Sequence, residues 1–355
     1  MNMMNTAKLI DWLMETAGPV IRYRTLRDII SQEDCLKFDA LRQRAYGSNE
    51  AQKWLGLLNG KNPLHHSKDI AFENITAKLG LYGLDMTFPE VALMIPRYLD
   101  LYCECLRDDS INMCLVSSLA LISYTDSSVE AVVTERIDTL HNTARQEMFK
   151  FLKSDAEKAD IPDKWHSKPI FREELGSAIP SAYDLLMLSL CKQQYPALSQ
   201  KIERIVEYIL DPRFQCYPSI IYAWRSEKRY CHSTVRPKIP CFQEESTSHD
   251  IMLDAYSRPR LLLYLYIMSH FSCTFSSPWY RSVLAHLTTF KTEMGTYIFP
   301  SEYLNEKPNG YFLYAGSHMG LGENRKHKIW REIESTFWML WLQKQEERLW
   351  NYGDD

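Results

Sequence analysis

The most concentrated set of polar side chains lies in the segment 242–260, directly before an apolar run that begins at Leu261. Asp250 and Asp254 stand four residues apart in this segment, so in a helix they would share one face. A carboxylate beside apolar walls has a raised pKa and can act as a general acid. We therefore predict an acid–base site with four catalytic residues, Asp250, Asp254, Tyr256 and Arg258, and with His249 as a substrate-binding residue.

The same segment also has the composition of an ordinary helix start. Serine and aspartate are common N-terminal caps, and Pro259 would suit the first turn of a helix. In this alternative Asp250 caps the helix and takes no part in chemistry.

Two other apolar segments begin with acidic side chains. Tyr183 and Asp184 precede the run Leu185-Leu186-Met187-Leu188, and Glu334 stands one helical turn before Trp338. We predict Asp184 as a further catalytic acid, and Tyr183, Glu334 and Trp338 as substrate-binding residues. The alternatives are a favourable interaction of Asp184 with the helix dipole and plain core packing of Trp338.

Glycines are sparse in the chain but concentrate in the segment 310–325, which contains Gly310, Gly316, Gly320 and Gly322. Glycine is favoured where the backbone takes a positive φ or approaches another group closely. We therefore predict an ordered loop that contacts substrate through His318, Glu323 and Arg325. A mobile surface loop is the alternative.

Two stretches have residue types that bind metals. His65, His66, Asp69 and Glu73 have spacings that could place them on one helix face, and Cys231, His232 and Cys241 form a second set. A solvated loop and helix start explains the first set, and coincidence explains the second, which lacks a fourth ligand. We predict neither a metal site nor a cofactor.

Composition narrows the class of protein. The 355 residues have 13 glycines but 21 tyrosines, 9 tryptophans and 14 phenylalanines, which favours a helical protein with an aromatic interior. The net charge of −4 gives no electrostatic basis for binding nucleic acid. The nine cysteines are scattered through apolar stretches, the N-terminus is not typical of a signal peptide, and the longest apolar run, Leu261 to Met268, is too short to span a membrane. We therefore expect a cytoplasmic protein without transmembrane segments.

Helical periodicity recurs along the whole chain, so helices must position these residues. It predicts helices over 6–16, 20–30, 70–82, 89–107, 111–124, 129–153, 181–192, 197–210, 257–271, 278–291 and 328–349. Segments that are apolar on all sides, centred near 76, 118, 187, 264 and 338, alternate with amphipathic ones. The pattern predicts an all-α fold with inner and outer helices, an (α/α) toroid or a helical solenoid. We expect one toroid domain over 1–355, with 1–50 a helical extension packed on it and long ordered loops over one mouth.

Several short motifs carry a resemblance to a known superfamily. They are Gln52-Lys53-Trp54-Leu55, Asn59-Gly60, Asn74 to Leu79, Gly83-Leu84-Asp85, Glu334 to Trp338, and the opening Trp12-Leu13, Val20 to Tyr23 and Leu26-Arg27-Asp28. The chain resembles the terpenoid cyclase and prenyltransferase superfamily, and in particular small bacterial proteins related to squalene–hopene cyclases. The resemblance implies an (α/α) toroid with a central aromatic-lined cavity. The Asp-X-Asp-Asp element with which such cyclases protonate their substrate is absent from this sequence.

Three functions remain open at this stage. The first is an enzyme of cyclase, isomerase or lyase type that acts on a hydrophobic or mixed small molecule by acid–base chemistry, without a redox cofactor. The second is a carbohydrate-active (α/α)6 barrel with paired carboxylates, such as Asp184 with Asp250 or Asp254. The third is a non-catalytic helical-repeat binding protein.

Overall fold

The computed structural model of the chain describes residues 5–30, 35–107, 111–225, 230–242 and 253–351. Helices predominate in these residues, which confirms the prediction of an all-α class. The longer helices are α1 (Thr6–Thr16), α2 (Pro19–Arg24), α3 (Cys35–Tyr46), α4 (Asn49–Leu55), α5 (Phe72–Tyr82), α6 (Pro89–Tyr102), α7 (Asn112–Leu121), α8 (Ser127–Arg145), α9 (Ala182–Gln194), α10 (Ser199–Ile209), α12 (Leu261–Met268), α14 (Pro278–Thr288) and α16 (Trp330–Asn351). The short ones are α11 (Pro212–Gln215), α13 (Ser272–Ser276) and α15 (Phe312–Ala315), and a π-helical turn, η1 (Thr25–Ile30), continues α2.

Local capping explains where several helices begin and end. The Asn5 side chain accepts from the Lys8 amide at 3.0 Å at the start of α1, and Ser181 forms a capping box with Asp184 at the start of α9. Helix α5 ends at Gly83, whose φ of 75° is readily adopted only by glycine. These signals are local, and the predicted bounds of α1, α5 and α9 lie within two residues of the observed ones.

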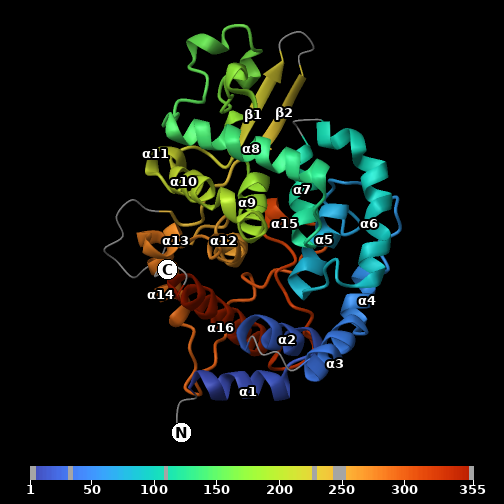
Figure 1. Cartoon of the computed structure of the whole chain (residues 1–355). Helices are drawn as coiled ribbons and strands as arrows, with labels where there is room; N and C mark the ends of the chain where they lie inside the picture. The colour runs from blue at the N-terminus through green and yellow to red at the C-terminus, as the bar shows by residue number, and fades with distance from the viewer. Residues whose placement is uncertain (1–4, 31–34, 108–110, 226–229, 243–252, 352–355) are drawn as a thin grey trace.

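The apolar helices pack on one another in the interior of the molecule. Helix α5 contacts α7, α7 contacts α9, and α9 contacts α12. Tyr266 of α12 lies 5.3 Å from Trp341 of α16 between ring centres, and α16 in turn packs on η1. Helix α2 then contacts α5 again, so these contacts lead from α5 through α16 back to α5 (Figure 1).

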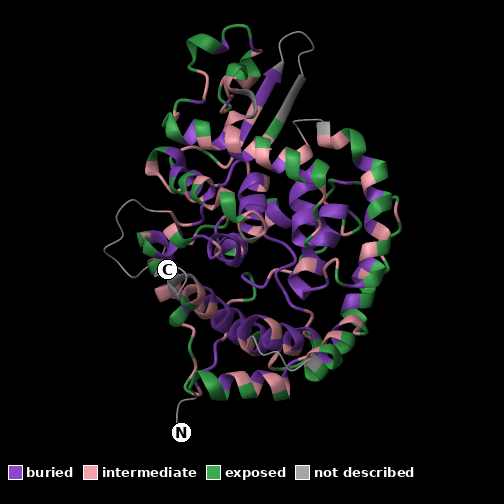
Figure 2. Ribbon diagram, in the orientation of Figure 1, coloured by how far each residue is buried: buried purple, intermediate pink, exposed green. Residues whose placement is uncertain are grey.

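The amphipathic helices lie outside this interior group. Helix α10 packs on both α8 and α9, and helices α6 and α8 carry exposed side chains on one face and buried ones on the other (Figure 2). By contrast, α12 is buried along its whole length, which is what an apolar surface on every side requires. None of the helices in the described part of the chain has the length and apolarity to cross a membrane.

Two segments differ from what the sequence predicted. An antiparallel hairpin of β1 (Ile220–Arg225) and β2 (Tyr230–Val235) lies between the predicted helices 197–210 and 257–271, where the sequence predicted no regular element. Its Trp224 packs 5.8 Å from Trp165 and so anchors the hairpin to the preceding loop. Helix α8 ends at Arg145, earlier than the predicted 153, and Glu147 then takes a positive φ of 49°.

Candidate functional site

The first turns of three interior helices bring four chemically active side chains together. Glu73 is the second residue of α5, Cys114 the third of α7 and Tyr183 the second of α9. His65 joins them from the segment that precedes α5. We call these four residues the first-turn cluster.

Glu73 is the centre of the first-turn cluster. Its Oε1 lies 2.7 Å from Nδ1 of His65, and its Oε2 accepts a hydrogen bond of 2.6 Å from the Tyr183 hydroxyl. The Cys114 thiol lies 3.8 Å from the same Oε2, and the Tyr183 hydroxyl is also 3.1 Å from Nδ1 of His65. The carboxylate therefore connects a base, an acid and a thiol through direct contacts.

Burial and the carboxylate shift the pKa values of the surrounding groups. Burial lowers the pKa of His65, but the hydrogen bond and charge of Glu73 outweigh it, so the net shift is upward. Burial raises the pKa of the Cys114 thiol well above its usual range, and Glu73 adds to that rise. The pKa of Tyr183 is also well above its usual value because of burial. Both Cys114 and Tyr183 are therefore protonated at neutral pH.

A small molecule could reach the first-turn cluster from the side of His65. The side chain of His65 is 42% exposed, whereas that of Glu73 is 4% exposed. The ring of Tyr311 stacks on His65 with 4.8 Å between centres, and Tyr183 approaches the same imidazole edge-on. The imidazole thus contacts two aromatic rings and a buried carboxylate, and it is partly exposed to solvent.

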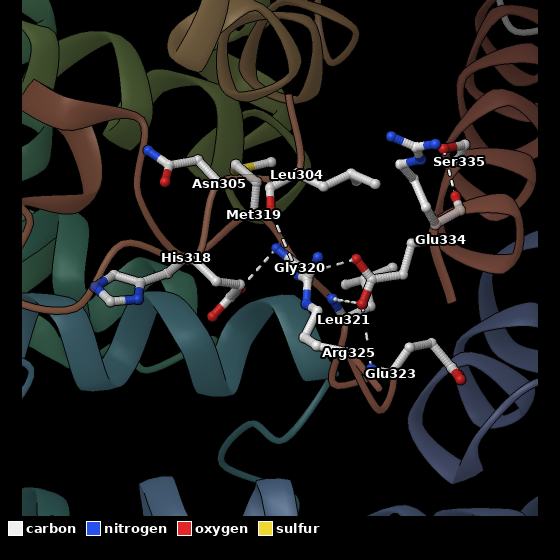
Figure 3. Close-up of polar contacts among 12 residues, drawn as sticks. Leu304, Asn305, His318, Met319, Gly320, Leu321, Glu323, Arg325, Glu334 and Ser335 are labelled. Atoms are coloured by element: carbon white, nitrogen blue, oxygen red, sulfur yellow. Dashed lines mark hydrogen bonds and ion pairs between the residues drawn. The ribbon is translucent and has the colours of Figure 1, made fainter. Parts of the chain in front are cut away.

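Five of the predicted site residues make contacts that hold the segment 304–325 against the interior. In Figure 3 the labelled residues of the segment 304–325 lie beside α16, and Glu334 points toward Leu321 and Arg325. Oε1 of Glu334 accepts from the amides of Leu321 (3.0 Å) and Glu323 (3.1 Å), and its Oε2 is 3.2 Å from Arg325. Trp338 donates from its indole nitrogen to the Met319 carbonyl at 3.3 Å. His318 packs edge-on against Trp54, and Glu323 accepts a hydrogen bond from the Gly18 amide, which caps α2.

A buried lysine fixes the same loop from the other side. Lys78 of α5 is 1% exposed and donates to the carbonyl oxygens of His318 and Gly320 and to the carboxylate of Glu306. Burial lowers the pKa of Lys78, although Glu306 opposes that shift. Because these carbonyls are satisfied by a cation and the amides by Glu334, the glycine-rich loop lies inside the molecule. The alternative of a mobile surface loop does not describe it.

Asp184 is a structural partner. It is fully buried, and its oxygens lie 2.6 and 2.8 Å from Nε and Nη2 of Arg136. Oδ2 also accepts from the amide and hydroxyl of Ser181, which completes the capping box. Its neighbour Tyr183, by contrast, points toward the first-turn cluster.

The residues predicted around 250–258 are only partly visible. His249 and Asp250 lie outside the described residues. Asp254 is exposed, accepts from the Ser257 amide at 2.7 Å, and has a lowered pKa because of the hydrogen bonds from Ser257. Arg258 is exposed and lies 3.9 Å from Glu302, while Tyr256 stacks under the guanidinium of Arg260 at 3.9 Å. These contacts are typical of a capped turn before α12.

A cavity of about 460 Å³ lies at the opposite ends of the interior helices. Its walls include Arg24, Arg27 and Asp28 from α2 and η1, and Tyr266 and Trp341. Arg24 and Arg27 both pair with Asp28, and together they lower the pKa of this carboxyl to about 2 although burial alone would raise it. Arg24 and Arg27 in the wall of this cavity therefore already share a carboxylate of the chain.

Comparisons of the chain with protein-family models, curated proteins and solved structures found no match. The function of the chain is therefore inferred from the geometry of the first-turn cluster. Sequence reasoning named Tyr183 and noted the spacing of His65 and Glu73, but it assigned those two to a solvated loop and helix start. Glu73 does stand at the start of a helix, α5, but its side chain is buried and not solvated. Cys114 stands in an apolar run and gave no signal of its own.

Proposed function

We propose that this protein is an enzyme that acts on a small molecule by acid–base chemistry at the first-turn cluster. The observation that carries the proposal is the hydrogen-bonded chain from His65 through Glu73 to Tyr183. An imidazole that donates from Nδ1 to a carboxylate is fixed in one tautomer and presents a basic Nε2 to a bound molecule. The Tyr183 hydroxyl, which donates to Glu73, is the corresponding acid.

The character of the site supports a hydrophobic or mixed substrate. Tyr311 and Tyr183 both contact the imidazole, so a ligand that reaches His65 meets aromatic rings next to it. A buried carboxylate as the hydrogen-bond partner favours removal and return of a proton over binding of an anion. We therefore propose a reaction of cyclase, isomerase or lyase type that needs no redox cofactor.

We further propose that the interior helices form an (α/α) toroid of the kind found in terpenoid cyclases. The contacts that lead from α5 through α7, α9, α12, α16 and α2 back to α5 support this arrangement. A toroid of parallel inner helices would gather the first turns at one mouth, as the cluster of Glu73, Cys114 and Tyr183 requires. A cytoplasmic location is part of the proposal, and the free thiols of Cys114 and Cys191 support it.

The carbohydrate-active alternative receives less support from the contacts. It depends on Asp184 paired with Asp250 or Asp254, and the oxygens of Asp184 are taken up by Arg136 and Ser181. The described Asp254 is engaged with the Ser257 amide. We therefore place the chemistry at the first-turn cluster.

The test is incubation of the purified chain with prenyl, polyprenyl and related cyclic and acyclic substrates, followed by mass spectrometry of the products. For any substrate turned over, His65→Gln should lower kcat by about 10²–10⁴-fold, the usual contribution of a general acid or base. The exposed neighbour His66 supplies the matched control, His66→Gln, which should leave kcat unchanged. Equal rates for the two variants would contradict the proposed site, and so would the absence of turnover and of any ligand-induced rise in melting temperature.

A further inference from the structure

We infer that His65, Glu73 and Cys114 bind a divalent transition-metal ion of the zinc type. Nδ1 or Nε2 of His65, a carboxylate oxygen of Glu73 and Sγ of Cys114 all lie within 4.8 Å of one another. The inference deepens the proposed function, because it assigns a ligand to the same cluster. It departs from the expectation drawn from the sequence, which included no metal.

The three donors have the chemistry that zinc selects. Imidazole nitrogen, carboxylate oxygen and thiolate sulfur are its usual protein ligands, at bond lengths of about 2.0–2.3 Å in a tetrahedral arrangement. Binding would release the thiol proton of Cys114 to solvent. Donor atoms around such an ion lie about 3.3–3.8 Å apart, which follows from those bond lengths and the tetrahedral angle. The observed separations are 2.7 Å from His65 to Glu73 and 3.8 Å from Glu73 to Cys114. The third separation, from His65 to Cys114, is at most 4.8 Å, so the three donors surround a volume of the size that such an ion needs.

The backbone around the cluster is fixed by contacts outside it. Helices α5 and α7 pack on each other along their length, so Glu73 and Cys114 keep their relative positions. The His66 amide donates to Oε1 of Glu73 at 3.2 Å, and Asn74 donates to the carbonyls of His66 and Lys68. The segment that carries His65 is thus tied to the first turn of α5 by several hydrogen bonds.

The surroundings provide a second shell and an entrance. The Tyr183 hydroxyl already donates to Glu73 and is positioned to orient a metal-bound carboxylate. His65 is exposed on one edge, while Cys114 is 4% exposed, so an ion would enter past the imidazole. Three protein ligands leave a fourth position of a tetrahedral site open, which is the pattern of catalytic rather than structural zinc. A metal bound there would supply Lewis-acid chemistry, and His65 would then act as a ligand in place of a base.

The inference is tested by spectroscopy of the full chain without any substrate. The protein is stripped with a chelator and titrated with Co²⁺, which reports four-coordinate geometry through visible bands and cysteine ligation through a thiolate-to-cobalt charge-transfer band. Bound zinc is measured in parallel by elemental analysis after dialysis. We expect one equivalent of metal, and a charge-transfer band that Cys114→Ser abolishes.

Matched variants separate the loss of a metal ligand from other effects of a substitution. Cys191 is another buried free thiol, in α9, so Cys191→Ser should retain the band. His65→Gln changes an exposed side chain and should weaken metal binding by at least 10-fold while the fold, measured by circular dichroism, is kept. His66→Gln should bind as the wild type does. Absence of metal binding by the wild-type chain, or a charge-transfer band that survives Cys114→Ser, would overturn the inference.

The outcomes separate this inference from the proposed function. Metal binding at the three residues without turnover of any substrate would contradict the acid–base enzyme and leave the metal site standing. Turnover by a chain that binds no metal, at a rate that chelation does not change, would contradict the metal site and leave the acid–base enzyme standing.

Discussion

The hydroxyl of Tyr183 donates a hydrogen bond of 2.6 Å to Oε2 of Glu73 and so joins the first turn of α9 to the first turn of α5. The two residues are 110 positions apart in the chain. Glu73 also contacts His65 and Cys114, so one buried carboxylate brings together groups from four segments. The chemical character of the site depends on this contact.

Removal of the Tyr183 hydroxyl should destabilise the protein. Tyr183→Phe leaves a buried carboxylate oxygen with only the distant Cys114 thiol as a donor, and hydrogen bonds to charged groups contribute about 1.5–3 kcal/mol. We expect the free energy of unfolding in urea to fall by about that amount. Tyr195→Phe is the control, because its hydroxyl meets Thr125 at an exposed position. A double-mutant cycle with Glu73→Gln should show a coupling energy between residues 73 and 183; additive effects would contradict the contact.

The ion pair of Asp184 with Arg136 should matter for stability rather than for catalysis. Asp184 is fully buried, and loss of one partner of a buried pair costs about 3–5 kcal/mol. We expect Asp184→Asn to lower the free energy of unfolding by at least about 2 kcal/mol. This is less than the full loss, because the amide of asparagine keeps one acceptor oxygen. The exposed pair of Asp138 with Lys201 gives the comparison, since Asp138→Asn should cost less than about 1 kcal/mol. A folded Asp184→Asn variant of normal stability that lacks turnover would restore Asp184 as a catalytic residue.

Asp28 should make stability depend on pH in the acid range. Arg24 and Arg27 lower the folded-state pKa of this carboxyl to about 2, below its ordinary value of 3.8, although burial opposes the shift. A lowered pKa stabilises the fold above the unfolded-state value, and the contribution is lost as the pH falls through about 2. The full contribution is about 2 kcal/mol, from the size of the shift.

The measurement compares the wild type with Asp28→Asn in urea at pH 7 and at pH 3. The difference in the free energy of unfolding should narrow by about 1 kcal/mol at the lower pH. Asp11 is exposed on α1, and Asp11→Asn should stay within about 0.5 kcal/mol of the wild type at pH 7. If the free energies of unfolding of the wild type and Asp28→Asn differ by the same amount at both values of pH, the arginines do not hold this carboxyl in its charged form.

Gly316 should tolerate no side chain. Its φ is 62°, and a Cβ there would lie 2.2 Å from the carbonyl oxygen of Pro259, just before α12. Gly316→Ala should therefore cost at least about 2 kcal/mol, from the left-handed backbone and the steric clash together. At the exposed Gly47 the nearest atom would be 3.3 Å away, so Gly47→Ala should change the melting temperature little. Similar melting temperatures for the two variants would mean that the loop and α12 are not in contact.

The sequence by itself determined where most of the longer helices lie, although α3 and α4 are not among the predicted ranges. Predicted and observed bounds coincide for α1 (Thr6–Thr16) and differ by about two residues for α5 and α9. The reason is that capping side chains, prolines and apolar periodicity act within a few residues along the chain. The late end of the predicted 129–153 helix is an exception, because the backbone turns at Glu147 without a glycine or proline to mark it.

The tertiary structure alone decided which side chains meet. Glu334, Arg325 and Trp338 have the composition of a site, but packing directs them onto the loop that precedes α16. Cys114 gains its neighbours only because α7 packs on α5 and brings the thiol beside Glu73, 41 residues earlier. Local patterns set the face that a helix buries, whereas the partner of a buried polar group is set by the relative position of two helices, which no short stretch of sequence encodes.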